Sequence, residues 1–155
     1  YNCTGTNDVY YSDMGDLSPT ETLTAQSQMA VGTNASAGFV ITALGAPLSA
    51  GTTTIPSLLT PTQSNPRVNQ FGINLVANSN PGIGLDPEGV WANATTAPDY
   101  GQADRYKFID GDIVASSPNV SLMKKFTVSY IVNVSPSLKA GVYTTTINFV
   151  ASGRF

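Results

Sequence analysis

Apolar and polar residues alternate along most of this chain, and this period of two constrains the fold more than any other feature. Alternation places apolar side chains on one face of a strand, whereas an amphipathic helix needs a spacing of three to four residues. The two clearest runs cover residues 126–134 and 143–149, and weaker runs cover 23–31, 39–43 and 71–77. No stretch has the pattern of an amphipathic helix. The sequence therefore predicts an all-β protein.

The number and spacing of these runs predict an antiparallel two-sheet sandwich of about seven to nine strands. Alternation does not determine strand order, so Ig-like and jelly-roll arrangements both remain open. Because Pro136 and Gly141 lie in the short connection between the last two runs, we expect those runs to form an antiparallel pair. A segment over 1–13 precedes one sandwich domain over 14–155.

Two irregular insertions, at 45–69 and 78–105, interrupt the predicted sandwich. Both are rich in glycine and proline, and the second contains the only tryptophan. Loops of this length inside a compact domain are usually functional or part of an interface. We therefore expect any binding surface to involve the second insertion.

The composition excludes much of enzyme chemistry. The chain has no histidine, so it has no Ser-His-Asp or Cys-His catalytic pair. A single cysteine cannot build a zinc or iron–sulfur site. Charged residues make up 11% of the chain, against about 25% in an average domain, and the net charge of −3 leaves no basic footprint for nucleic acid. We expect a protein that is not an enzyme, binds no nucleic acid and needs no cofactor.

The remaining polarity comes mostly from Thr, Ser and Asn, a composition common in secreted and cell-surface β-proteins because Thr suits a half-exposed strand. No apolar run approaches the roughly 20 residues that span a bilayer, so we expect no membrane insertion. The chain begins at Tyr1 and not at a methionine, which suggests removal of a signal segment or trimming. These features together predict an extracellular or cell-surface location.

Two segments carry a resemblance to bacterial surface proteins. The run over 126–135, followed by Ala-Gly-Val-Tyr-Thr-Thr-Thr-Ile at 140–147, resembles the closing strands of WxL-type cell-surface domains. The stretch over 14–24 resembles the first strand of TasA/camelysin-type matrix-fibre proteins, although Thr20 stands where those proteins have glycine. The Trp-x-Leu pair of WxL domains is absent, since Trp91 is followed by Ala and Asn.

The resemblance to fibre proteins implies a mode of assembly in which subunits lend a terminal strand to a neighbour's sheet. It implies a structural subunit of an extracellular filament, pilus or biofilm-matrix fibre whose partners are copies of itself. The segment 1–13 would be the donor, and the interface side chains would be Tyr1, Cys3, Val9, Tyr10 and Tyr11. The same segment could instead be the domain's own first strand or a frayed terminus, and Cys3 could be a small buried apolar residue.

A monomeric carbohydrate-binding or adhesin module on the cell surface is the main alternative function, and a viral capsid or decoration protein is a weaker one. The alternative rests on three aromatic residues in or beside the second insertion, which could form a loop interface or a sugar-stacking platform: Trp91, Tyr100 and Tyr106. Against this, a tryptophan in such a loop can also close the end of a sandwich by burying its ring.

Carboxylates in predicted turns give a weak calcium hypothesis, since calcium prefers carboxylate and carbonyl oxygens. The residues are Asp86, Glu88, Asp110 and Asp112, and their spacing is not that of an EF-hand. Asn-x-Ser/Thr sequences mark potential glycosylation sites in an exported chain. The acceptors are Asn2, Asn34, Asn93 and Asn119, whereas Asn133 lies within a predicted strand and is the poorest acceptor.

Overall fold

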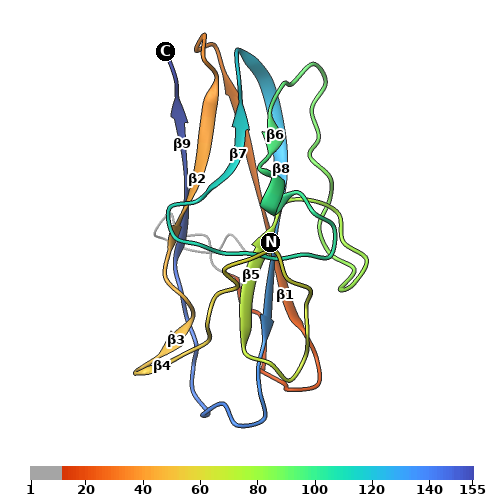
Figure 1. Cartoon of the computed structure of the whole chain (residues 1–155), viewed down its shortest axis with the longest axis vertical. Coiled ribbons are helices and arrows are strands. Elements are labelled where there is room, and N and C mark those ends of the chain that lie inside the picture. Colours follow the sequence, from red (N-terminus) through yellow and green to blue (C-terminus); the bar gives the residue numbers. More distant parts are fainter. Residues whose placement is uncertain (1–11) are drawn as a thin grey trace.

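The computed structural model describes residues 12–155 as an all-β sandwich, which confirms the predicted fold class (Figure 1). One antiparallel sheet has the order β1 (Leu23–Thr33), β8 (Ser121–Asn133), β5 (Gln70–Asn74). The other has the order β6 (Thr95–Thr96), β7 (Ile113–Ser117), β2 (Phe39–Gly45), β9 (Ile147–Gly153). A small hairpin, β3 (Ser49–Ala50) and β4 (Thr53–Thr54), and one 3-10 turn, η1 (Pro98–Tyr100), complete the described elements.

Strand β8 is the centre of the first sheet, and both of its faces are buried over most of its length. Its alternating residues Phe126, Val128 and Val132 point into the core between the sheets. On its opposite face Ser129 lies against Gly84, and beyond the end of β5 the Glu88 N–H donates to the carbonyl of Lys125 at 3.0 Å, so the 78–105 insertion lies along β8.

The core joins the inner faces of the two sheets. Phe71 from β5 and Phe108 pack edge to face, with ring centroids 5.3 Å apart and an interplanar angle of 64°. Phe39 and Ile41 from β2 meet this cluster from the opposite sheet. Aromatic pairs of this geometry add stability beyond their buried area, so this cluster fixes how the sheets face each other.

The second insertion is anchored by the amide of Asn74, which is fully buried at the end of β5. Its Nδ2 donates to Asn78 Oδ1 at 2.6 Å and to the carbonyls of Gln102 at 3.1 Å and Arg105 at 3.2 Å. Its Oδ1 accepts from Asn78 Nδ2 at 2.8 Å. One side chain therefore connects the start of the 78–105 insertion to its end.

The expected pairing between the last two alternating runs is wrong. β8 pairs with β1 and β5, while β9 pairs with β2 in the other sheet. The chain between them crosses from one sheet to the other, and Thr144 is held on the way by reciprocal hydrogen bonds with Ser49, each 3.1 Å long. β9 consequently begins only at Ile147, after the first half of the second run.

Within residues 12–155, no helix is long and apolar enough to cross a membrane.

Candidate functional site

One long side of the sandwich is closed by main-chain hydrogen bonds between the sheets. The chain around η1 pairs with both: Ala97 N donates to Val114 O at 2.8 Å in one sheet, and Tyr100 O accepts from Leu75 N at 2.9 Å just after β5 in the other. Lys107 and Ile73 exchange a further pair of hydrogen bonds at the edge of β5. This side therefore offers little free main chain.

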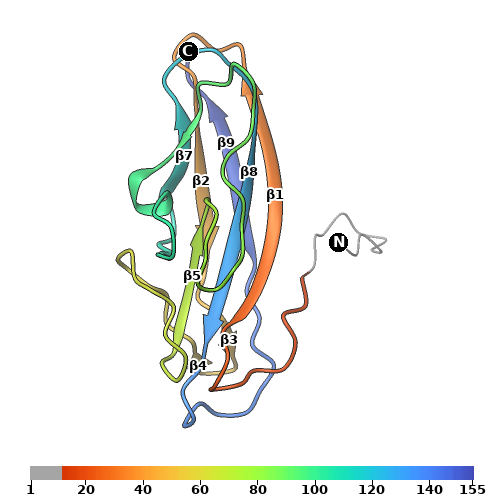
Figure 2. The same ribbon diagram turned by 90° about the vertical axis from the view of Figure 1, so that its right-hand side faces the viewer.

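The opposite side ends in β1 of one sheet and β9 of the other. Each of these strands pairs along one edge only, β1 with β8 and β9 with β2, in the part of the chain that the structure describes. In Figure 2, β9 lies at the side of its sheet nearer to β1, whereas β5 and β7 lie on the other side. We call the side bounded by β1 and β9 the open side. It presents two unpaired strand edges, which are templates for adding another strand.

The inner faces of these two edge strands are incompletely covered. Alternate residues of β1, including Met29 and Val31, face the core but are only half-buried. On β9, Phe149 is half-buried, and Ala151, which follows it on the same face, is exposed. In contrast, Phe39 and Ile41 on the neighbouring β2 are each only 1% exposed. Inward-facing side chains are thus fully buried in the middle of the sandwich and only partly buried along the open side.

The predicted donor residues lie outside the described part of the chain. This applies to Tyr1, Cys3, Val9, Tyr10 and Tyr11, and also to the glycosylation candidate Asn2. The described chain begins just after them, and residues 12–22 connect the segment 1–11 to β1, a strand of the open side. Its assignment as donor, own first strand or terminus stays a prediction.

The three aromatic residues of the second insertion do not share a surface. Trp91 is 84% exposed and adopts a positive φ of 59°, so it does not close the end of the sandwich. Tyr100 and Tyr106 are buried, with exposures of 1% and 0%. A sugar-stacking platform made of all three is therefore absent, and only Trp91 can contact a partner from this set.

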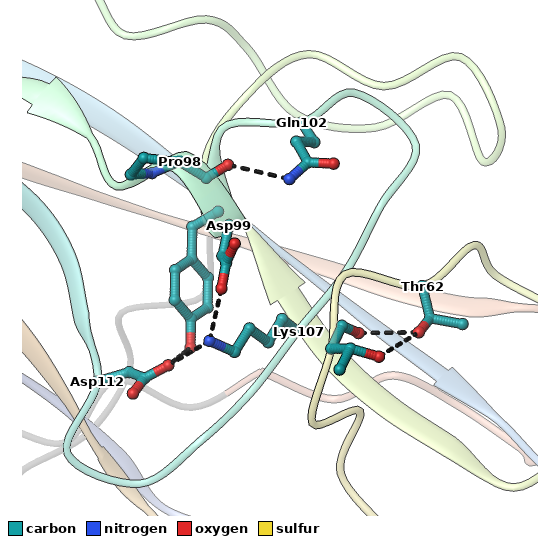
Figure 3. A network of polar contacts seen from close by, with 8 residues as sticks. Thr62, Pro98, Asp99, Gln102, Lys107 and Asp112 are labelled. Atoms are coloured by element: carbon teal, nitrogen blue, oxygen red, sulfur yellow. Dashed lines mark hydrogen bonds and ion pairs between the residues drawn. The ribbon is translucent and has the colours of Figure 1, made fainter.

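Tyr100 belongs to a compact charged cluster with Lys107 (Figure 3). Lys107 Nζ lies 2.9 Å from Asp99 Oδ2 and 2.8 Å from Asp112 Oδ2, and the Tyr100 hydroxyl donates to Asp112 Oδ2 at 2.9 Å. Burial alone lowers the pKa of Lys107, but its hydrogen bonds to the two carboxylates and their charges outweigh burial and hold the pKa above its usual value. The lysine therefore stays charged and joins η1 to the start of β7.

Alkaline pH is expected to destabilise the fold. Burial raises the pKa values of Tyr100, Tyr106 and Tyr130, so above about pH 10 the unfolded chain releases protons that the folded chain retains. The raised pKa of Lys107 acts in the same direction. The free energy of unfolding should therefore fall as pH rises beyond 10 and stay nearly constant between pH 6 and 8, since the chain has no histidine. Denaturant titrations at a series of pH values measure this; a stability that is flat up to pH 12 would contradict it.

The calcium candidates are dispersed, and each contacts protein groups. Asp86 accepts from the Ala77 N–H and Asp110 from the Gly45 N–H, while Glu88 pairs with Lys125 at 2.8 Å. Asp112 belongs to the Lys107 cluster. Over residues 12–155, no group of three His, Cys, Asp or Glu side chains is placed to hold a metal ion.

Three of the sequons lie at one end of the molecule, where Asn34, Asn93 and Asn119 are all exposed. Asn93 Nδ2 donates to Asn119 Oδ1 at 2.8 Å and to the Val120 carbonyl at 2.9 Å, so the nitrogen that a glycan would modify is already engaged. Asn133 is fully buried and bonded to Gln70, in agreement with its low rank as an acceptor.

Two features of this arrangement carry no signal in the sequence. The open side depends on which strands become edges, and alternation is the same in edge and central strands. The Lys107 cluster joins side chains from three separate positions in the sequence, 99–100, 107 and 112, and no spacing in the sequence indicates that they meet.

Comparisons of this chain with protein-family models, with curated proteins and with solved structures find no match.

Proposed function

We propose that this chain is a non-enzymatic structural subunit of an extracellular filament, pilus or matrix fibre that assembles by β-strand donation between copies. The observation that carries the proposal is the open side, where two neighbouring strand edges and a half-buried inner face lie together. A donated strand supplies main-chain hydrogen bonds to an edge, and its alternate side chains fill the space along the inner face.

Completion of the open side by a donated strand would bury apolar surface as well as pair main chain. Burying three or four apolar side chains is worth on the order of 5–10 kcal/mol before the cost of ordering the donor. The half-buried residues that would receive them include Met29 on β1 and Phe149 on β9. The donor we propose is the segment 1–13, because it contains apolar residues at strand-like spacing and is joined to β1 through residues 14–22.

Carbohydrate binding by a monomer is the second candidate function, favoured by one observation. Trp91 presents its ring to solvent on a loop, which is how a sugar-stacking residue is displayed. The buried positions of Tyr100 and Tyr106 leave it without a second aromatic partner from the same insertion. We therefore rank this function below filament assembly.

Deletion of residues 1–13 tests the proposal. We expect the full chain to form filaments visible by negative-stain microscopy, and the deleted chain to remain monomeric or to lose stability. A synthetic peptide of residues 1–13 should bind the deleted chain and restore its stability in thermal denaturation. If the deleted chain forms filaments as readily as the full chain, strand donation by this segment is excluded.

A matched pair of lysine substitutions on β1 separates the open side from other surfaces. Met29→Lys places a charge on the inner face, where a donated strand would pack, and should prevent filament growth. Gln26→Lys places the same charge on the exposed outer face of the same strand and should leave growth unchanged. Because both positions are on an edge strand, we expect the two monomers to remain folded by circular dichroism. Equal filament yields from the two variants would place the contact elsewhere.

A further inference from the structure

Large apolar side chains are exposed together at one end of the sandwich. Of the thirteen large hydrophobic residues with exposed side chains among residues 12–155, five lie on the segment 90–91 and on the adjoining start of β8. We call this surface the apolar end, and it consists of Val90, Trp91, Val120, Leu122 and Met123. Trp91 and Val90 are the most exposed of the five, at 84% and 76%. Concentrated apolar exposure of this kind marks interaction sites on soluble proteins.

The main chain holds the apolar end in place. Glu88 and Lys125 exchange two hydrogen bonds of 3.0 and 2.7 Å, and Gly89 packs against the Met123 carbonyl. At the other end of the segment, the backbone N–H of Asn93 donates to the Ser121 hydroxyl at 3.0 Å. The loop that displays Trp91 is thus fixed along β8, so a partner would meet a preformed surface.

The charges near the apolar end are mainly positive. Lys124 and Arg154 form no salt bridge among residues 12–155, whereas Lys125 is paired with Glu88. Arg154 belongs to this end because its N–H donates to the Gly38 carbonyl at 2.8 Å, and Gly38 packs against the turn at Asn119. A docking partner should therefore carry apolar groups together with negative charge.

The segment that precedes β1 carries negative charge together with two half-buried apolar side chains, Met14 and Leu17. Residues 12–22 contain Asp13, Asp16 and Glu21, all exposed, and no lysine or arginine. Thr22, at the end of this segment, is bonded to Asn133 Oδ1 at the far end of β8, which places Thr22 roughly 40 Å from the apolar end. Figure 2 shows the chain descending to the lower end of the sandwich before β1 rises.

From this complementarity we infer that the apolar end of one copy docks onto the acidic segment 12–22 of the next copy. The inference rests on the proposed filament and adds to it a second, end-to-end contact. Apposition of two apolar ends would bring Lys124 and Arg154 of both copies together, which like-charge repulsion disfavours. A contact between different ends does not close on itself and continues into a filament.

Charge exchange tests this contact. Lys124→Glu with Arg154→Glu makes both ends negative, and Asp16→Lys with Glu21→Lys makes both ends positive. We expect each double variant to raise the critical concentration for filament formation at least tenfold at low salt. The chain with all four substitutions has the charges exchanged and should return to within about threefold of the original value. Pelleting assays over a range of protein and salt concentrations measure these changes, and salt should reduce them.

The apolar contribution is tested separately by Trp91→Ala with Leu122→Ala. Since both side chains are exposed, thermal stability should be unchanged while the critical concentration rises at least tenfold. Leu44→Ala removes an exposed leucine from β2 and is the control, expected to assemble normally.

The outcomes distinguish this inference from the proposed function. Asp16 and Glu21 lie outside the donor segment 1–13, so their effects do not depend on the donor's own residues. If all these variants assemble at the original critical concentration, the end-to-end contact is overturned and the filament remains. If the critical concentration of the chain with all four substitutions stays as high as that of the double variants, the charge pairing is overturned. If the full chain forms no filaments, both proposals are overturned. A glycan array in which binding requires Trp91, with assembly unaffected by its loss, would overturn the contact and favour the carbohydrate-binding alternative.

Discussion

Replacing Gly38 with alanine is expected to lower the free energy of unfolding by more than about 4 kcal/mol, the range of severe core defects. Gly38 has a φ of 76°, which an L side chain rarely adopts, and an added Cβ would overlap with the carbonyl of Ser117. It would also lie 2.8 Å from the backbone nitrogen of Asn119. Because all the obstructing atoms are backbone, the turn between β7 and β8 would have to move away from β2.

Gly111→Ala is the matched control. Gly111 also has a positive φ, of 85°, but no atom lies within 4 Å of an added Cβ. Its substitution should cost only about 1–2 kcal/mol, the penalty of the backbone conformation alone. Urea denaturation of both variants measures the difference. Equal losses would mean that the conformation, and not the close approach to Ser117, determines the requirement for glycine at position 38.

Asn74→Ala is expected to cost about 3–5 kcal/mol and to loosen the 78–105 insertion. The substitution removes the hydrogen-bond donor to the carbonyls of Gln102 and Arg105 and the amide partner of Asn78. Each buried polar group left without a partner costs about 1–3 kcal/mol. Because these hydrogen bonds tether the insertion that displays Trp91, hydrogen exchange of its backbone amides should become faster, and global stability should fall at the same time.

An asparagine without buried contacts provides the comparison for Asn74. Asn148 is exposed on β9, and its replacement by alanine should change stability by no more than about 0.5 kcal/mol. Denaturant titration gives the global values, and hydrogen exchange followed by mass spectrometry locates the loosened segment. A stable Asn74→Ala variant with normal protection over 78–105 would show that other contacts hold the insertion.

The sequence predicted the fold class because alternation reports one covered face per strand, and this holds for β1, whose residues alternate between half-buried and exposed. The sequence did not predict the strand pairing correctly, because alternation shows which face of a strand is buried and does not show which strand lies beside it. The turn at Pro136–Gly141 looked like a hairpin, yet Thr144 pairs with Ser49, so β9 joins β2 in the opposite sheet. Short connections favour pairing of neighbours but do not enforce it when another edge is available.

The candidate site was predicted in part. The second insertion does display an exposed aromatic residue, but sequence alone did not distinguish Trp91 from Tyr100 and Tyr106. Whether each side chain is buried depends on contacts with residues distant in the sequence. Tyr100 donates a hydrogen bond to Asp112, and Tyr106 exchanges main-chain hydrogen bonds with Thr62. Trp91 instead follows Gly89 around a bend with positive φ, which turns its ring toward solvent. The open side became visible only once the edges of both sheets were known.

The length and direction of β1 have a mechanical consequence for a filament of this kind. β1 spans Leu23–Thr33 along the long axis of the molecule, and its free edge runs in the same direction. A donated strand lying along that edge would be pulled parallel to its own axis when the filament is stretched. All its hydrogen bonds would then bear load together, in shear, and none could be opened one by one as in peeling. The pairing between the donated strand and β1 would therefore resist tension along the fibre most strongly, and a force perpendicular to the fibre least strongly.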